Sequence, residues 1–373
     1  LQLLTAQQRR AAGHYADFQR YLAAAWKSVD KAASPAFAAD IARLYGLSLQ
    51  MSGKMREAGT WYRRGWELAR TSGDGTAMAN AQVGLARYAL ADGSVLEAEK
   101  MSDSSVRFFE EVGDTRGLSI ALPVWVDALR LQGRFSEALA ALRMRLPAMK
   151  AGEAPTYYVR LALANAWCEA DLCRLGRAQE GVDELVSTLR KGEHLHLRLE
   201  ADLLAGRVLV DSGQWEEAVE VLPVMIERAE EAELVFLAEH ARALWAEALA
   251  ALGKLDGARA RFRDALTRVQ AYGDMSTLAA ICAARVRAMA EHDDPNDLFE
   301  SLREWMVQNK LYALQVEFLI ARARHRAAKG LDASSDWQEA RACLEAVTQR
   351  LDDTERAVFR VHPWSRAVLQ GEA

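Results

Sequence analysis

The segment GQWEEAVEVL, which runs from Gly213 to Leu222, closely resembles GRFSEALAAL, which runs from Gly133 to Leu142, eighty residues earlier. In each segment an alanine follows the glycine after five residues, and a leucine follows the alanine after four. A short pattern that returns at a fixed interval indicates a structural repeat rather than a single catalytic site. The fold therefore depends on whether the same interval holds elsewhere.

A similar pattern returns along the whole chain at intervals of 40, 40, 40, 43, 37, 40, 40 and 37 residues. The 43-residue interval followed by one of 37 indicates two slips that compensate each other. A period near forty that holds over 373 residues predicts one long solenoid rather than two or three globular domains. The turn residues that mark the period are Gly13, Gly53, Gly93, Gly133, Gly176, Gly213, Gly253, Asp293 and Gly330.

One unit, from Gly73 to Gly113, contains two helical runs, residues 76–91 and 95–111, on either side of Gly93. Glycine supplies a positive φ at the end of a helix without a side-chain penalty. Small residues such as Ala86 and Ala98, on either side of the turn, let two paired helices approach closely. Each repeat is therefore predicted to be a helical hairpin.

This two-helix unit resembles the tetratricopeptide repeat, in a long variant near forty residues. The resemblance implies an all-α, right-handed α-solenoid of about eight to nine stacked repeats over residues 1–351, followed by a capping tail, 352–373. The stretch from Thr354 to Leu369 resembles the short tail that closes such arrays in large bacterial regulators. In those regulators a kinase or nucleotide-binding module precedes the array. Because residues 1–12 read as the latter part of a helix, we expect more protein upstream of Leu1.

Composition bounds the classes of partner. The chain has 47 Lys and Arg against 52 Asp and Glu, a net charge of -5, and the two signs are mixed. Without a basic stripe, nucleic acid is not expected as a partner. Four cysteines, Cys168, Cys173, Cys282 and Cys343, read as buried thiols in a reducing compartment. The absence of a long apolar run predicts a cytoplasmic protein without a membrane partner.

No phosphate-binding loop, dinucleotide fingerprint, paired-histidine metal helix or nucleophile elbow occurs in the sequence. His194 and His196 stand two residues apart, a spacing that places them on different sides of a helix. We therefore expect no enzymatic activity, no cofactor and no metal. An enzyme whose site lies between helices without a recognisable motif stays open as a minor alternative.

In superhelices of the tetratricopeptide type, the first helix of each hairpin lines a concave groove, so groove residues can be counted back from each turn residue. Counting back six residues from Gly176 gives Ala170, and counting back ten gives Ala166. The residues predicted to bind a partner are Arg43, Asn80, Arg87, Asp127, Arg130, Arg207, Glu247, Arg287 and Arg324.

Arginine grips carboxylates in two-pronged geometry. Arg43, Asn80, Arg87 and Arg130 are therefore the preferred cluster for an acidic peptide segment or chain terminus. The alternative is a solvated groove in which Arg207 pairs with Glu247 and Arg87 pairs with Asp127.

The leading hypothesis is a non-catalytic scaffold that binds a protein or acidic peptide segment along the groove. It would be the sensor or docking region of a larger bacterial signalling or transcription regulator, flexing to pass occupancy to an upstream kinase or nucleotide-binding domain. The alternative is a structural module that self-associates or assembles a complex through its convex face or end helices.

Overall fold

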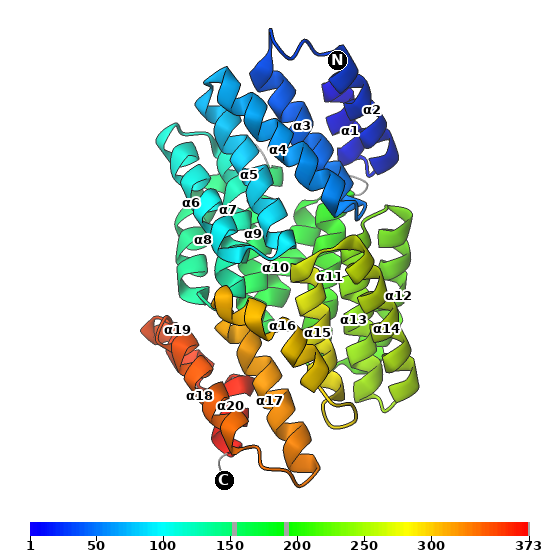
Figure 1. The fold of residues 1–373 in the computed structure, drawn as a ribbon, viewed down its shortest axis with the longest axis vertical. Helices are drawn as coiled ribbons and strands as arrows, with labels where there is room; N and C mark the ends of the chain where they lie inside the picture. Colours follow the sequence, from blue (N-terminus) through cyan, green and yellow to red (C-terminus); the bar gives the residue numbers. More distant parts are fainter. Residues whose placement is uncertain (151–154, 190–193, 372–373) are drawn as a thin grey trace.

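The structure, a computed structural model, describes residues 1–150, 155–189 and 194–371. Within those ranges the chain forms twenty α-helices and no strand, which confirms the predicted all-α repeat fold (Figure 1). The helices are α1 (Gln2–Ala11), α2 (Tyr15–Ser28), α3 (Pro35–Met51), α4 (Met55–Ser72), α5 (Gly75–Asp92), α6 (Val95–Glu111), α7 (Thr115–Leu131), α8 (Phe135–Lys150), α9 (Pro155–Asp171), α10 (Leu175–Thr188), α11 (Leu195–Asp211), α12 (Trp215–Glu231), α13 (Val235–Ala251), α14 (Leu255–Tyr272), α15 (Met275–Met289), α16 (Asn296–Gln308), α17 (Tyr312–Ala328), α18 (Ser334–Thr348), α19 (Asp353–Phe359) and α20 (Pro363–Gln370).

Odd-numbered helices from α3 to α17 contact one another in sequence and form the inner layer of the solenoid. The turn after each inner helix is tight. At Gly53, whose φ is 77°, its own N–H donates to the Gln50 carbonyl oxygen at 2.9 Å, and the Lys54 N–H donates to Leu49 at 2.9 Å. This pair of bonds is a Schellman motif, which satisfies the last carbonyls of the helix. The glycine therefore recurs because its positive φ allows the backbone to form this turn.

The predicted turn at Gly176 is wrong, because Gly176 lies in the first turn of α10. The residue with positive φ is Cys173, at 53°, and its neighbour Arg174 donates to the Glu169 carbonyl oxygen at 2.8 Å, as in the glycine turns. The turn residues from 13 to 253 therefore follow an unbroken interval of 40, without the predicted slips. The glycine marker failed here because a non-glycine residue can accept the left-handed conformation at an energetic cost.

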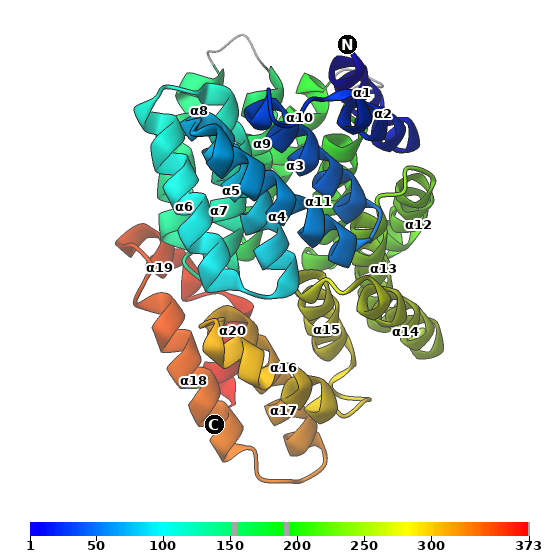
Figure 2. The ribbon, with the colours of Figure 1, turned by 45° about the horizontal axis from the view of Figure 1, so that its top comes forward.

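Successive turns of the superhelix touch (Figures 1 and 2). A Cβ built on Gly13 would lie 2.8 Å from Leu195, and one built on Gly53 would lie 3.1 Å from Val235. Leu195 and Val235 each follow their partner glycine by 182 residues, as Met275 follows Gly93. At 40 residues per hairpin, one superhelical turn contains about four and a half hairpins.

Directed hydrogen bonds and apolar packing join the two superhelical turns. The His194 N–H donates to the Ala11 carbonyl oxygen at 2.7 Å, and the Val95 N–H donates to Asn309 Oδ1 at 2.9 Å. Buried side chains of α1 and α2, including Phe18, share one hydrophobic cluster with α11, α12 and α13. The second superhelical turn therefore packs directly against the first.

At the C-terminal end, α20 packs on α17 and α18. The carboxylate of Glu355 in α19 is buried and accepts a hydrogen bond of 3.1 Å from Arg143 Nη1 and another from the Ser136 hydroxyl. These contacts attach α19 to α8. The division into an array and a tail at residue 352 stays a prediction.

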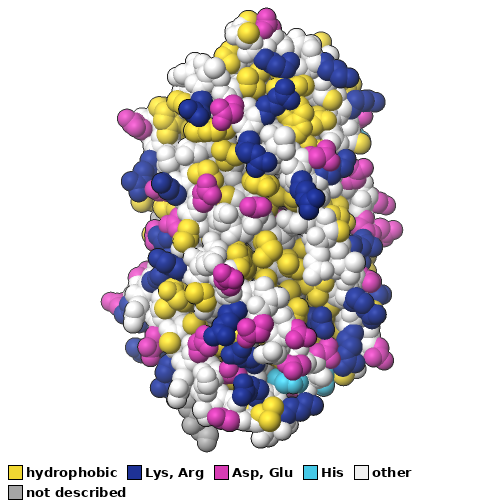
Figure 3. All heavy atoms as spheres, in the orientation of Figure 1, with side chains coloured by type: hydrophobic (Ala, Val, Ile, Leu, Met, Phe, Trp, Pro, Cys, Tyr) yellow, Lys and Arg dark blue, Asp and Glu magenta, His cyan; other side chains and the backbone are white. Residues whose placement is uncertain are grey.

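The outer face carries charges of both signs, interspersed over the surface that Figure 3 shows. In the described part of the chain, no helix combines the length and apolarity needed to cross a membrane.

Candidate binding cavity

The interior of the first superhelical turn contains a cavity of about 490 Å³. Its walls come from α1, from the inner helices α3, α5, α7, α9, α11 and α13, and from Tyr62 of α4. Most of the lining residues stand 6, 10, 13 or 17 residues before a turn residue, a spacing of three or four that places them on one helix face. At the seventeenth position, for example, are Arg116, Thr156, His196 and Phe236. The repeat thus generates the cavity wall.

Five arginines and two carboxylates line this cavity. Arg43 is neutralised by Asp40, whose Oδ1 lies 2.5 Å from Arg43 Nη2, and Asp127 is neutralised by Arg130 at 3.0 Å. The remaining carboxylate is Glu200. Within the described ranges, no ion pair forms at the other four lining arginines, Arg10, Arg87, Arg116 and Arg160. The cavity therefore has an excess of positive charge.

The electrostatics of the individual groups reflect this excess. Burial, with repulsion from Arg43, lowers the pKa of Arg10 to about 10, and burial, with repulsion from Arg10 and Arg87, lowers the pKa of Arg160 to about 9. Burial and the charge of Arg10 also lower the pKa of His196 well below its usual range, so this ring is neutral at pH 7. Burial raises the pKa of Glu200 to about 7, although Arg87 attracts its charged form. The site disfavours further cations and favours an anion.

Apolar side chains fill the spaces between the charges. Val83, Leu163 and Leu197 are buried in the wall, and Tyr62 is buried with its hydroxyl donating to Gln50 Oε1 at 2.9 Å. The volume of the cavity is within the range of ligand sites, and its wall combines apolar side chains with many charged ones.

Farther along the superhelix, the charged side chains of the interior form ion pairs with one another. Arg287 binds Glu247 at 3.0 Å and Glu317 at 2.8 Å, and Arg130 also binds Asp171 at 2.7 Å. Arg207 pairs with Asp211 at 2.5 Å and not with Glu247, so the pairing expected in the alternative reading is wrong. The other expected ion pair, Arg87 with Asp127, also does not form among the described residues.

The predicted site residues thus fall into distinct groups. Arg43, Arg87 and Asp127 line the cavity. Arg130 is the ion-pair partner of Asp127, and its guanidinium lies 5.3 Å from the ring of Trp167. Asn80 is half-buried on α5 outside the cavity lining, and Arg324 is exposed on α17. Arg207, Glu247 and Arg287 belong to the paired region. The structure therefore brings only part of the predicted set together.

Sequence reasoning missed Arg10, Arg116 and Arg160. Counting back from Cys173 instead of Gly176 places Arg160 at the thirteenth position and Leu163 at the tenth, and both line the cavity, unlike the predicted Ala170 and Ala166. For Arg160 the missed signal was the unbroken 40-residue interval itself. Arg116 and Arg10 stand 17 and 3 residues before Gly133 and Gly13, at positions outside the predicted rows.

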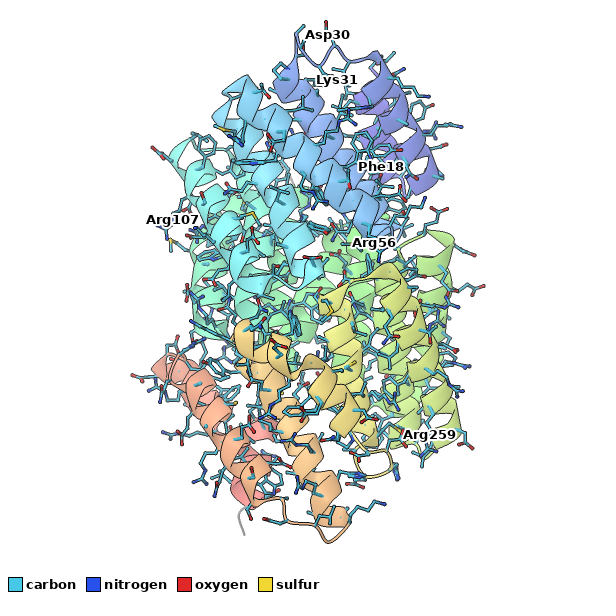
Figure 4. All side chains as sticks on the ribbon, viewed as in Figure 1. Phe18, Asp30, Lys31, Arg56, Arg107 and Arg259 are labelled. Atoms are coloured by element: carbon cyan, nitrogen blue, oxygen red, sulfur yellow. The ribbon has the colours of Figure 1, made fainter. Side chains whose placement is uncertain are left out.

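Some arginines on the outer surface are paired with carboxylates. Figure 4 shows Arg107 and Arg259 projecting from the outer helices α6 and α14. Arg107 binds Asp103 at 3.0 Å and Arg259 binds Asp293 at 2.9 Å. Other exposed arginines, such as Arg56 and Arg324, form no ion pair among the described residues, but Arg10, Arg87 and Arg160 differ from them in being half-buried.

No family model matches the sequence, and no curated protein matches it. Among solved structures, a Rap protein complexed with competence and sporulation factor superposes with a TM-score of 0.70 at 11% identity, covering 94% of this chain and 98% of that one. Aspartyl phosphate phosphatase F from Bacillus subtilis superposes with a TM-score of 0.50 at 14% identity, covering 95% of this chain and 94% of that one. Together with the hairpins described above, these similarities confirm a tetratricopeptide-like repeat array. Identities this low show the fold and carry over no activity.

Proposed function

We propose that this chain is a non-catalytic scaffold that binds an acidic peptide segment, or the acidic terminus of a partner protein, inside the cavity of its first superhelical turn. The observation that carries the proposal is the set of four arginines that face the cavity without an ion pair among the described residues. Arg116 is exposed, but Arg10, Arg87 and Arg160 are half-buried. A guanidinium partly removed from bulk water without a counter-charge is unfavourable, and a carboxylate relieves that cost.

The individual roles follow from position. Arg87 lies in the cavity wall. Its positive charge acts to lower the pKa of each of four neighbouring groups, Arg10, Arg160, Glu200 and Asp127. A peptide carboxylate at this point would meet several guanidiniums at once. Charge-assisted hydrogen bonds are worth about 1.5–3 kcal/mol each, so two of them would dominate the affinity. Apolar wall residues such as Val83 and Leu163 would contact the rest of the peptide.

The comparisons support a binding role at the level of the fold, because a protein of this architecture was solved with a factor bound. We further propose that the chain is the sensor or docking region of a larger bacterial regulator in the cytoplasm. Its partners would then include a kinase or nucleotide-binding domain upstream in the same chain.

The test is fluorescence anisotropy with a labelled oligoglutamate peptide and an oligoglutamine peptide of the same length. The wild type should bind only the acidic peptide, and Arg87→Glu should weaken binding by at least about tenfold, the equivalent of 1.4 kcal/mol. Arg324→Glu, an exposed charge reversal outside the cavity, is the matched control and should bind as the wild type does. Equal affinities for wild type and Arg87→Glu, with circular dichroism unchanged, would exclude this site.

One observation favours a second candidate function, self-association through the outer helices. Val221 and Val224 are exposed by 43% and 56%, and they stand three residues apart on one face of the outer helix α12. Light scattering over a range of concentrations separates the candidates, since a monomer at all concentrations would argue against assembly.

A further inference from the structure

We propose that the α1–α9–α11 end of the cavity is a subsite for an oxyanion group with at least two negative charges, and that Glu200 takes up a proton when this group binds. The subsite would be formed by Arg10, Arg87 and Arg160. This inference rests on the proposed function, because the subsite is one end of the same cavity. It adds the position and charge of the group that is recognised.

The closure of the superhelix brings these residues together. Arg10 precedes Ala11, whose carbonyl oxygen accepts the 2.7 Å hydrogen bond from His194 immediately before α11. Arg160 lies on α9, one turn after Thr156, whose hydroxyl is 3.0 Å from His194 Nε2. Helices α1, α9 and α11 are therefore joined at this end, and each contributes a charged residue to the cavity wall.

The charges at this end do not balance. Three guanidiniums face one carboxylate, that of Glu200, and among the described residues none of the four forms an ion pair. A single carboxylate leaves two positive charges uncompensated. A ligand group with two or more negative charges would restore the balance, whereas a neutral ligand would leave it.

An unpartnered polar atom at the same end provides an independent indication. His196 lines the cavity, and its Nδ1 is buried without a hydrogen-bond partner. Tyr15, which is only 8% exposed, lies nearby: burial raises its pKa, and Arg10 and Glu200 act on that pKa in opposite directions. Buried polar groups without partners are uncommon, and at a cavity they indicate a place where a ligand supplies the partner.

The protonation of Glu200 follows from its surroundings. Tyr15 on α2 lies within electrostatic reach of Glu200. The charged or titratable groups that line the cavity around Glu200 are Arg10 on α1, Arg43 on α3, Tyr62 on α4, Arg87 on α5, Arg116 and Asp127 on α7, Tyr157 and Arg160 on α9, His194 immediately before α11 and His196 on α11. Burial raises the pKa of Glu200 to about 7. Below pH 7 the neutral carboxyl of Glu200 does not compete with the ligand for the arginines. Above pH 7 the Glu200 carboxylate does compete for them. A bound anion raises the pKa of Glu200 further, so binding near pH 7 to 8 takes up a proton.

Two sources could supply such a group, a phosphate or a pair of adjacent carboxylates. Arginine binds both in bidentate geometry, so the shared chemistry is that of a compact polyanion. Pyrophosphate and citrate are the probes that represent the two sources.

The experiment is isothermal titration calorimetry of the full chain with pyrophosphate and with citrate at pH 6.5 and pH 8, each in two buffers of different ionisation enthalpy. The wild type should bind at least one probe, with more proton uptake than Glu200→Gln and with an affinity that falls more steeply from pH 6.5 to pH 8 than that of the variant. Arg160→Gln should weaken binding by at least about tenfold. Arg56→Gln, which neutralises an exposed arginine on the outer helix α4 (Figure 4), is the control and should bind as the wild type does.

Glu200→Gln keeps the test informative if Arg160→Gln fails to fold. This variant should bind the probe more tightly at pH 8 and with less proton uptake than the wild type, a result that loss of structure cannot produce. Because the probe and the arginines exchange the same protons in both proteins, equal proton uptake by the wild type and Glu200→Gln would overturn the linkage, and a wild type that binds neither probe at millimolar concentration would overturn the subsite. If oligoglutamate still binds in that case and depends on Arg87, the proposed function stands alone. If oligoglutamate fails as well, both proposals fall.

Discussion

The indole Nε1–H of Trp305 donates a hydrogen bond of 2.6 Å to the carbonyl oxygen of Gly93, although the two residues are 212 positions apart in the chain. Gly93 ends α5 in the first superhelical turn, and Trp305 lies on α16 in the second. The bond therefore joins two layers that share no local sequence. The contacts between superhelical turns therefore include hydrogen bonds as well as apolar packing.

Removal of that hydrogen bond should loosen the axial contact. Trp305→Phe keeps an aromatic ring but leaves the Gly93 carbonyl without its donor, so we expect the free energy of unfolding to fall by about 1–3 kcal/mol. Urea denaturation followed by circular dichroism measures this change. Trp215→Phe is the control, because Trp215 is 38% exposed and its loss should change stability by less than about 0.5 kcal/mol. Similar values for the two variants would contradict the role assigned to Trp305.

A matched pair of turn glycines isolates the contribution of packing between superhelical turns. Gly53 and Gly253 have φ values of 77° and 73°, so alanine at either position costs about 1–2 kcal/mol of backbone strain. A Cβ at Gly253 meets nothing within 4 Å, whereas one at Gly53 would lie 2.9 Å from Tyr272. Gly53→Ala should therefore lower the melting temperature more than Gly253→Ala. If calorimetry gives the same loss of melting temperature for both variants, the Tyr272 side chain moves aside without an energetic cost.

Cys173 offers the opposite experiment. Its φ of 53° carries the strain that a glycine would avoid, so Cys173→Gly should stabilise the protein by up to about 1 kcal/mol. Cys173→Ala keeps the Cβ and should give no such gain. If both variants lose stability equally in chemical denaturation, the thiol packing of Cys173 outweighs the backbone strain.

His362 should make the C-terminal helices sensitive to acid. Its Nδ1 accepts a hydrogen bond of 3.2 Å from the Trp364 N–H at the start of α20, which requires the neutral ring, and burial lowers the pKa of His362 to about 4. A lowered histidine pKa gives stability that is present above pH 6.5 and is lost as the pH falls toward 4.

His362→Asn keeps a capping side chain that does not titrate. The difference in unfolding free energy between wild type and His362→Asn should therefore shrink between pH 7 and pH 4.5. Urea titrations at three pH values in that range provide the measurement, and a constant difference would show that His362 stays neutral or does not matter for stability.

The sequence predicted the hairpins well because the left-handed turn after each inner helix restricts the residue to glycine in most repeats. It failed at residue 173, where the fold accepts a strained cysteine, and that single error moved Arg160 and Leu163 out of the predicted groove rows. Arg43, Arg87 and Asp127 were found because they follow the helical period alone. The closure of the cavity could not be predicted, since it depends on the pitch of the superhelix, which is set by contacts such as Gly13 with Leu195.

The contacts between superhelical turns also limit how the molecule can deform. A Cβ built on Gly13, Gly53, Gly93 or Gly133 would lie within 3.1 Å of a side chain of the next superhelical turn, so the coil has no space in which to shorten. It can only lengthen or untwist. An occupant of the interior could then act mechanically in two ways, either by locking the coil at its minimum length or by wedging it open, and the distance between the chain termini would report which of the two occurs.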